Sequence, residues 1–486
     1  MFRSENENLN SLLKDKFGFD EFRPGQKETL EKLLKNESVL SLMPTGSGKS
    51  LTYQLMAFAQ PKEQLVLVVS PLIALMQDQV NKARDLGLQA ACINSALSFD
   101  EKQKVLKNLS EKKYQLLLVT PERFKKSDFL EALSKVKVSL FVVDEAHCVS
   151  LWGHDFRPDY AKLNTFRKNL GSPIVLALTA TATEDVQQDI AKQFEIDLKK
   201  DLIFGGLERP NIALSVEEIY GAEEKNEKIL EVIEKSPDDS MIVYFSLIQT
   251  LEKTSHFLEK LKIPFQKYHG DLPANVRRKN QNNFLQGKEK IILATPAFGL
   301  GIDKPDIRTV IHYEIPSSLE AYFQEVGRAG RDGKPAKGIF LFDEDDLTIQ
   351  MQFLNWAYPE KEFIRKVYHL IQKNPDRVAT EGFDYLREQM VFKNKKDFRV
   401  NAAVSILQRW GSLEEVTTPF GYAAVEEPTE EDFLREDQNI LKKEHQKKLL
   451  SMLRWLQNTQ RCRLLQIYDY FGYHKETPCG ICDVCR

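Results

Sequence analysis

The sequence predicts an α/β, doubly wound fold that is divided into two lobes of similar size. Between about Val39 and Leu347, short apolar runs alternate with amphipathic stretches of helical spacing. The runs are apolar almost throughout, which is typical of strands buried on both faces of a parallel sheet. This alternation is interrupted at the glycine-containing stretch 205–211, which suits a hinge. We therefore expect a parallel sheet covered by helices on each side of that hinge.

The expected strands follow from the individual apolar runs. Helical spacing is found between them, for example at Glu101–Ser110 and Gln249–Leu261. The first lobe is expected to contain strands at Val39–Met43, Leu65–Ser70, Leu116–Thr120, Leu140–Asp144 and Ile174–Leu178, and the second lobe at Ile242–Ser246, Lys290–Ala294, Thr309–Tyr313 and Gly338–Phe342.

Beyond Asp346 the sequence becomes more polar and helical. The step from a helix through Gly411 into Leu413–Val416 is similar to a small winged helix, and a helical spacer is an equally good interpretation. An acidic loop lies between Glu426 and Asp437. Helices are expected at Phe363–Gln372, Phe383–Gln389, Phe398–Trp410 and about Asn439–Arg463.

The composition is that of a folded protein without a membrane anchor. The 486 residues suggest about three domains at roughly 150 residues each. A net charge of −3 excludes a bulk polycation that binds nucleic acid through net charge alone, although a local basic groove is compatible with it. Apolar runs long enough to span a bilayer are lacking, and residues 1–7 are too polar for a signal peptide. We expect a soluble, intracellular protein.

A phosphate-binding loop is predicted directly after the first apolar run. The sequence Thr45-Gly46-Ser47-Gly48-Lys49-Ser50 follows an expected strand and opens an expected helix. In that context glycines allow backbone N–H groups to surround phosphate oxygens at a helix N-terminus. Lys49 would reach the β- and γ-phosphates and Ser50 would bind Mg²⁺. A glycine turn before an ordinary helix is the weaker interpretation.

A pair of carboxylates is expected beside that loop. Asp144 and Glu145 end the apolar run that begins at Leu140, and ligands bind at the carboxyl ends of strands in open α/β sheets. Asp144 would hold Mg²⁺ through its water shell, and Glu145 would orient and deprotonate an attacking water. Paired acids also occur as simple surface caps of strands, but the P-loop about one hundred residues earlier favours the catalytic interpretation.

A cysteine cluster near the end of the sequence predicts a metal site. Four of the six cysteines, Cys462, Cys479, Cys482 and Cys485, lie within the last 25 residues. Two overlapping Cys-x₂-Cys steps plus a distant thiolate suit tetrahedral Zn²⁺. An iron–sulfur cluster and free thiols are the alternatives.

These motifs and their surroundings resemble RecQ-family DNA helicases of superfamily 2. Asp144-Glu145-Ala146-His147 after a P-loop is the superfamily signature, and Phe17–Gln26 is similar to the segment that grips adenine in RecQ proteins. The resemblance implies that Arg23 and Gln26 contact the base and that Phe19 stacks on it.

The resemblance covers residues 17–346 and resumes at about 439–485. It implies two tandem RecA-like P-loop NTPase lobes, a helical or winged-helix-like insert and a four-cysteine zinc-binding helical subdomain. The corresponding division of the chain is 1–206 for the ATP-binding lobe, 207–346 for the second lobe, 347–437 for the insert and 438–486 for the zinc-binding subdomain.

A segment rich in aromatic residues is the most specific of the resembling motifs. Cys148–Tyr160 is similar to the RecQ loop that senses single-stranded DNA and signals to the ATPase. Trp152 and Phe156 would offer faces on which bases stack, worth about 1–3 kcal/mol per base. Arg157 would supply a phosphate or cation–π contact. Burial of both aromatic side chains in the core is the alternative.

The second lobe contributes arginines by the same resemblance. Ala294–Asp303 and Gln324–Gly333 resemble motifs that touch nucleotide and DNA, and they imply that Asp303 binds the nucleotide. Arg328 and Arg331 are three residues apart and are expected on one face of a helix. One of them on the γ-phosphate would act as an arginine finger, and we favour Arg331. A solvated basic helix end is the alternative.

The resemblance implies an ATP- and Mg²⁺-dependent helicase that is stimulated by DNA and also binds Zn²⁺. It would move 3′→5′ along single-stranded DNA and unwind forked DNA in repair and recombination. It would act as a monomer without a membrane partner, in the cytoplasm, and at the nucleoid if the source is bacterial. The rival interpretations are an ATP-gated remodeller or annealing factor without processive unwinding, and an RNA helicase. A non-enzymatic binding module is the third.

Overall fold

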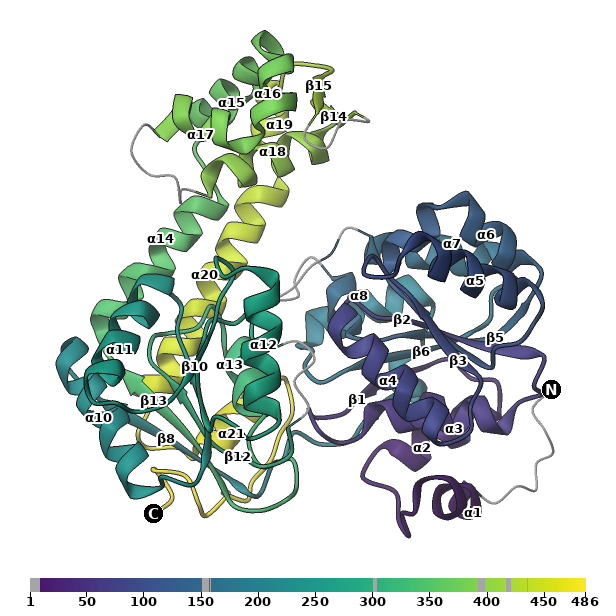
Figure 1. Ribbon diagram of the computed structural model, residues 1–486, viewed down its shortest axis with the longest axis horizontal. Helices are drawn as coiled ribbons and strands as arrows, with labels where there is room; N and C mark the ends of the chain where they lie inside the picture. The colour runs from purple at the N-terminus through teal and green to yellow at the C-terminus, as the bar shows by residue number, and fades with distance from the viewer. Residues whose placement is uncertain are drawn as a thin grey trace. The chain divides into compact units, whose positions relative to one another are not determined.

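The computed structural model describes residues 9–150, 157, 159–299, 304–391, 398–416, 421–434 and 436–486 (Figure 1). Two compact units make up the chain. One consists of Met1–Glu314, Leu319–Phe342 and Trp455–Arg486, and the other of Ile315–Ser318 and Asp343–Arg454. The larger unit contains the two large parallel sheets and the cysteine cluster. The predicted division into four domains stays a prediction.

The first lobe is built on a seven-stranded sheet with the order β3-β4-β2-β5-β6-β1-β7. Its pairs are parallel, for example Val66 with Leu116 and Val68 with Val142. The strands are β1 (Val39–Leu42), β2 (Gln64–Val69), β3 (Ala90–Ile93), β4 (Leu116–Val119), β5 (Lys137–Val143), β6 (Ile174–Thr179) and β7 (Leu202–Phe204).

Helices lie on both faces of this sheet (Figure 1). Along β2, Leu65, Leu67 and Val69 enter one hydrophobic core, whereas Val66 and Val68 enter the other. The doubly buried strands predicted from the continuous apolar runs are therefore confirmed. The longer helices are α2 (Gln26–Leu34), α3 (Lys49–Ala59), α4 (Ile73–Asp85), α5 (Phe99–Ser110), α6 (Ser127–Ser134), α7 (Leu163–Asn169) and α8 (Glu184–Phe194).

The second lobe is built on a six-stranded parallel sheet with the order β10-β11-β9-β12-β13-β8. Its strands are β8 (Ile212–Glu218), β9 (Ser240–Tyr244), β10 (Gln266–Tyr268), β11 (Ile291–Ala294), β12 (Ile307–His312) and β13 (Ala336–Phe342). Its helices are α10 (Gly221–Lys235), α11 (Ile248–Lys260), α12 (Ala274–Leu285) and α13 (Leu319–Val326).

The smaller unit is mainly helical and has a core of its own around Ile364, Val367, Val404 and Leu407. The strand expected after Gly411 is present, and it pairs antiparallel in a short hairpin. The helices and the hairpin share this core, and the winged-helix-like and helical-spacer interpretations both stay predictions. The elements are α14 (Leu347–Ala357), α15 (Lys361–Lys373), α16 (Pro375–Glu381), α17 (Phe383–Val391), α18 (Arg399–Trp410), β14 (Leu413–Glu415), β15 (Tyr422–Ala424), α19 (Glu430–Leu434) and α20 (Glu436–Gln457).

The long helix expected at Asn439–Arg463 ends earlier than predicted. Helix α20 stops at Gln457, and a separate helix, α21, runs from Arg463 to Tyr470. The buried Arg463 guanidinium donates to the carbonyl oxygens of Trp455, Leu456 and Asn458, and so satisfies the end of α20. Of the helices in the described part of the chain, none combines the length and the apolar character that crossing a membrane demands.

Packing of the second lobe leaves no room for a side chain at Gly338 in β13. A Cβ there would lie 2.3 Å from Val326 Cγ2 and 3.1 Å from Leu214 Cδ2. We predict that Gly338→Ala lowers the free energy of unfolding by about 1–3 kcal/mol, because overpacking forces the neighbours to shift. Urea titration followed by circular dichroism would measure it.

Gly270→Ala is the matched control for that substitution. At Gly270, nothing in the described residues lies within 4 Å of the added methyl group. We expect the free energy of unfolding of Gly270→Ala to lie within about 0.5 kcal/mol of the wild-type value. Equal unfolding free energies for the two variants would contradict the packing argument.

Candidate nucleotide and metal sites

The P-loop connects β1 to α3, and two of its glycines are required by their surroundings. Gly46 and Gly48 have φ values of 81° and 82°, in the region that favours glycine. A Cβ on Gly46 would lie 3.2 Å from Arg331 Cγ, and one on Gly48 would lie 3.0 Å from Gln26 Nε2. Larger residues at either position would therefore disturb both the backbone and a neighbouring side chain.

The carbonyl oxygens of the P-loop are held from outside by side chains. Arg209 NH1 donates to Thr45 O at 3.0 Å, and Arg23 NH1 donates to Gly46 O. Gln26 Nε2 donates to the carbonyl oxygens of Ser47 and Gly48, at 2.9 and 3.1 Å. These bonds fix the peptide planes of the loop, and in other P-loops the backbone N–H groups of such a loop bind an anion.

The predicted carboxylate pair lies at the carboxyl end of β5. Asp144 accepts hydrogen bonds from Ser70 Oγ at 3.2 Å and from the backbone N–H of Glu145 at 3.1 Å. Burial, together with the charge of Glu145, raises the pKa of Asp144 to about 6, although Lys49 and Ser70 oppose this shift. Burial and the neighbouring carboxylate therefore disfavour the ionised form of Asp144, and a divalent cation bound there would offset that cost.

Glu145 has the geometry of a functional residue. Its φ of 49° lies in the left-handed region, which is uncommon for residues other than glycine. Its Oε2 is buried and has no hydrogen-bond partner among the described residues, while His147 Nδ1 lies 3.5 Å away. His147 also pairs with Thr179 Oγ1 at 3.0 Å, at the end of β6. An acceptor is thus available for a water in the cavity.

Arg328 and Arg331 lie in a turn, and the predicted helix face is wrong. Helix α13 ends at Val326, and Gly330 and Gly333 in the following turn have φ values of 53° and 81°. Glycines with positive φ end helices because they tolerate the left-handed backbone. Both arginines nevertheless line the same cavity as the P-loop.

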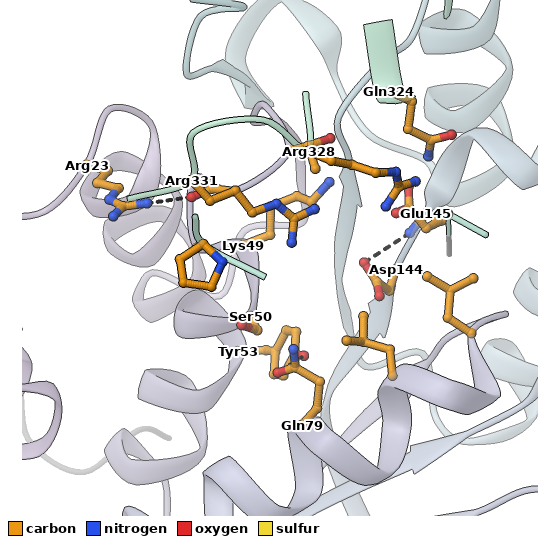
Figure 2. Close-up of a pocket in the computed structure, with 17 residues that line it drawn as sticks. Arg23, Lys49, Ser50, Tyr53, Gln79, Asp144, Glu145, Gln324, Arg328 and Arg331 are labelled. Atoms are coloured by element: carbon orange, nitrogen blue, oxygen red, sulfur yellow. Dashed lines mark hydrogen bonds between the residues drawn. The ribbon is translucent and has the colours of Figure 1, made fainter. Parts of the chain in front are cut away.

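The cavity has a volume of about 350 Å³, which is within the range of small-molecule sites (Figure 2). Side chains from both lobes converge on it, with four cationic and two acidic groups in its lining. The charged and phosphate-loop residues in the lining are Arg23, Thr45, Gly46, Gly48, Lys49, Ser50, Asp144, Glu145, Arg328 and Arg331, and Tyr53, Leu72, Leu75, Gln79, Gly299, Pro305 and Gln324 complete it. This combination can bind a polyphosphate together with a divalent cation.

Some predicted residues lie away from this lining or outside the described residues. Gln26 is buried behind the P-loop, and Phe19 is 52% exposed. Arg157 is half-buried, and its N–H donates to Cys148 O at 3.0 Å. The other three predicted contacts, Trp152, Phe156 and Asp303, lie outside the described residues.

Sequence reasoning missed two partners of the predicted residues. Ser70 bonds to Asp144, and its position at the end of an expected strand could have revealed it, because neighbouring strand ends meet at one edge of the sheet. Arg209 holds the P-loop from the segment between the lobes, and no spacing in the sequence points to that contact.

The four terminal cysteines come together as predicted, and their geometry fits zinc. Their Sγ atoms all lie within 4.8 Å of one another. The pairs Cys479–Cys485 and Cys482–Cys462 are each separated by 3.9 Å. A tetrahedron with metal–sulfur bonds of about 2.3 Å has sulfur–sulfur edges of about 3.8 Å. The backbone N–H of Cys479 also donates to Cys462 Sγ, as expected around a thiolate ligand.

The cysteine subdomain is attached to the edge strand β8. Asp483 N–H donates to Leu214 O at 3.0 Å, and Asp483 Oδ2 accepts from Val216 N–H at 3.0 Å. The same carboxylate pairs with the buried Arg463. The metal-binding turn therefore covers part of an otherwise open sheet edge.

Matches to known families cover both lobes and the cysteine subdomain. Residues 23–190 match the DEAD/DEAH box helicase family, 224–333 the helicase conserved C-terminal domain, and 427–486 the RecQ zinc-binding domain. The last region includes all four cysteines.

Individual relatives agree with these matches. The probable ATP-dependent DNA helicase RecS of Bacillus subtilis is 40% identical over 370 residues, which are 76% of this chain and 74% of that protein. The ATP-dependent DNA helicase RecQ of Haemophilus influenzae is 30% identical over 98% of this chain, which spans 63% of that relative. The structure of Saccharomyces cerevisiae Dbp5 bound to RNA and ADP BeF3 shares the fold, with a TM-score of 0.55 at 17% identity over 71% of this chain and 90% of that one. The predicted pair of RecA-like lobes is confirmed.

We predict that Cys482→Ser removes bound zinc and lowers the thermal midpoint by several degrees. The substitution deletes one of the four thiolates that would hold the ion, and binding of a structural metal contributes directly to the free energy of folding. Metal analysis of the purified full chain and thermal unfolding would measure both effects.

Cys92→Ser is the control, because Cys92 is a buried free cysteine in β3 and lies outside the cluster. It should retain the wild-type ratio of zinc to protein. Full zinc content in Cys482→Ser would contradict the four-thiolate site.

Proposed function

The chain belongs to the RecQ family of ATP-dependent DNA helicases, and from that membership we propose that it couples ATP hydrolysis to 3′→5′ movement along single-stranded DNA. The observation that carries this proposal is the convergence of the P-loop, the carboxylate pair and two arginines on one cavity. Opening and closing of that cavity would change the spacing of DNA contacts on the two lobes with each ATP consumed.

The cavity residues divide the chemistry of ATP hydrolysis among them. Lys49 would neutralise the β- and γ-phosphates, and Ser50 and Asp144 would hold Mg²⁺, which supplies charge neutralisation when bound. The unpartnered Oε2 of Glu145 would accept a proton from the attacking water. Arg331, with Arg328 beside it, would stabilise charge that develops on the transferred phosphoryl group.

The DNA signal would reach this site through the aromatic-rich loop. The described residues on both sides of 151–156 are bonded to each other through Arg157 N–H and Cys148 O. The Tyr160 hydroxyl donates to Asp144 O at 3.1 Å. A base that stacks on Trp152 or Phe156, with Arg157 on its phosphate, would therefore act close to the carboxylate pair.

The remaining assignments follow from the family. Arg23, Gln26 and Phe19 would receive the adenine base, and Asp303 would contact the nucleotide. We propose that the chain unwinds forked DNA in repair and recombination, as a monomer in the cytoplasm and at the nucleoid in a bacterium. We propose no membrane partner for the chain.

The catalytic assignment is tested by DNA-stimulated ATP hydrolysis. Lys49→Ala should abolish it, and Arg331→Ala should lower kcat by about 10³-fold, as expected for an arginine finger. Lys334→Ala removes an exposed cation of the same turn and should leave the rate close to that of the wild type. A wild-type rate for Arg331→Ala would move the arginine-finger role to Arg328.

The substrate and the polarity are tested with strand-displacement assays. A duplex with a 3′ single-stranded tail and a fork should be unwound, and one with only a 5′ tail should not. Single-stranded DNA should stimulate ATP hydrolysis more strongly than RNA of the same sequence. ATP hydrolysis without strand separation would favour the remodelling or annealing activity, and preferential stimulation by RNA would favour an RNA helicase.

A further inference from the structure

Arg209 connects the P-loop to the turn that carries Arg328 and Arg331. It lies between β7 and β8, in the segment that joins the lobes. Its NH1 donates to Thr45 O at 3.0 Å and to Gly327 O at 2.7 Å. Its NH2 donates to Ala329 O at 2.6 Å and to Gly330 O at 2.9 Å. One planar guanidinium thus holds a carbonyl of the first lobe and three carbonyls of the second.

The surroundings of Arg209 are unfavourable for a cation. Its hydrogen bonds must therefore offset the cost of keeping the charged side chain there. The side chain is half-buried, and burial with the nearby charges of Arg331 and Arg23 lowers its pKa to about 10. Four carbonyl acceptors offset this cost. The nearest acid that opposes the shift is Asp332.

The four hydrogen bonds of the Arg209 guanidinium set the spacing between the P-loop and the arginines. Thr45 belongs to the P-loop, and the segment Gly327–Gly330 contains Arg328. NH1 of Arg209 also lies 3.5 Å from where a Cβ of Gly46 would be, beside Arg331 Cγ at 3.2 Å. A displaced turn would therefore carry the Arg331 stem away from the P-loop.

We propose that Arg209 is a positioning residue that fixes the arginine-bearing turn against the P-loop for ATP hydrolysis. This inference rests on the proposed function, since it assigns Arg209 to the same reaction. The hydrogen bonds of the guanidinium within the described part of the chain go to backbone carbonyls, and it acts through Arg328 and Arg331. Loss of the bridge should affect recognition of the third phosphate and leave recognition of the nucleoside diphosphate largely unchanged.

Asn211 provides a matched comparison within the same segment. Its Nδ2 donates to Gly330 O at 2.7 Å and to Lys334 O at 2.8 Å, both in the second lobe. Asn211→Ala therefore weakens the support of the turn without breaking a bond to the P-loop. Arg209→Ala breaks the bonds on both sides, and Arg209→Lys retains the charge without the planar fork.

The experiment compares full-length Arg209→Ala, Arg209→Lys and Asn211→Ala with the wild type. Binding of fluorescent ADP is measured with and without beryllium fluoride, which mimics the γ-phosphate, and DNA-stimulated kcat is measured beside it. For Arg209→Ala we expect kcat and the affinity gained from beryllium fluoride to fall about ten- to hundredfold, as for the loss of one charged hydrogen bond or more. ADP affinity should change by less than about threefold. Arg209→Lys should be intermediate, and Asn211→Ala close to wild type.

Equal losses of kcat and of the affinity gained from beryllium fluoride in Arg209→Ala and Asn211→Ala would overturn the proposal. Support of the turn within the second lobe would then explain both variants without the bond to the P-loop. Equal weakening of ADP binding with and without beryllium fluoride would also overturn it. Zinc content and thermal unfolding establish that the variants are folded, and Arg209→Lys carries the test if Arg209→Ala does not fold. A wild type that gains affinity from beryllium fluoride but does not unwind DNA would overturn the proposed function alone, because the binding measurement requires no strand separation.

Discussion

Unbalanced positive charge in the cavity is the constraint on which the rest of the site depends. Arg23, Lys49, Arg328 and Arg331 line it, against the two carboxylates of Asp144 and Glu145. Like charges in a partly desolvated space repel one another, so the arrangement is complete only when an anion neutralises it. A triphosphate with one divalent cation has the opposite sign of charge. The hydrogen bonds from Arg209 and Gln26 to the P-loop carbonyls serve the same end, because they fix the loop that would surround that anion.

The order of the strands explains how distant segments meet at this cavity. In the first sheet β2, β5, β6 and β1 are consecutive neighbours, and all run in the same direction. Their carboxyl ends therefore deliver Ser70, Asp144, Thr179 and the P-loop side by side. The backbone continues this alignment, since Asp144 N–H donates to Val69 O and Met43 N–H to Thr179 O. Parallel topology thus converts separations of 74 to about 140 residues into direct contacts.

The interior of each sheet could be predicted from the sequence, and its edges could not. All the apolar runs chosen as strands are strands, whereas the four described strands of the two parallel sheets that were missed, β3, β7, β8 and β10, are the outer strands of those sheets. Three of these, β7, β8 and β10, are only partly buried, so they lack the continuous apolar character of a doubly covered strand. β3 is buried, but Ala90-Ala91-Cys92-Ile93 has little of the β-branched character that marks a strand. Arg209 was missed for a different reason, because its partners lie 118 to 164 residues away along the chain and are backbone atoms that any residue could supply.

The segment between the lobes contacts both the zinc-binding subdomain and the P-loop. Phe204 stacks on Tyr473 with ring centroids 3.6 Å apart, and Leu207 N–H donates to the Tyr468 hydroxyl at 3.2 Å. Two residues later, Arg209 holds the P-loop. Trp455, Ile467 and Phe471 are buried in this subdomain, and four thiolates around one bound ion would add a further constraint. A bound metal would therefore stabilise the same short segment from which the phosphate loop is held, and the net charge of the chain has no part in either contact.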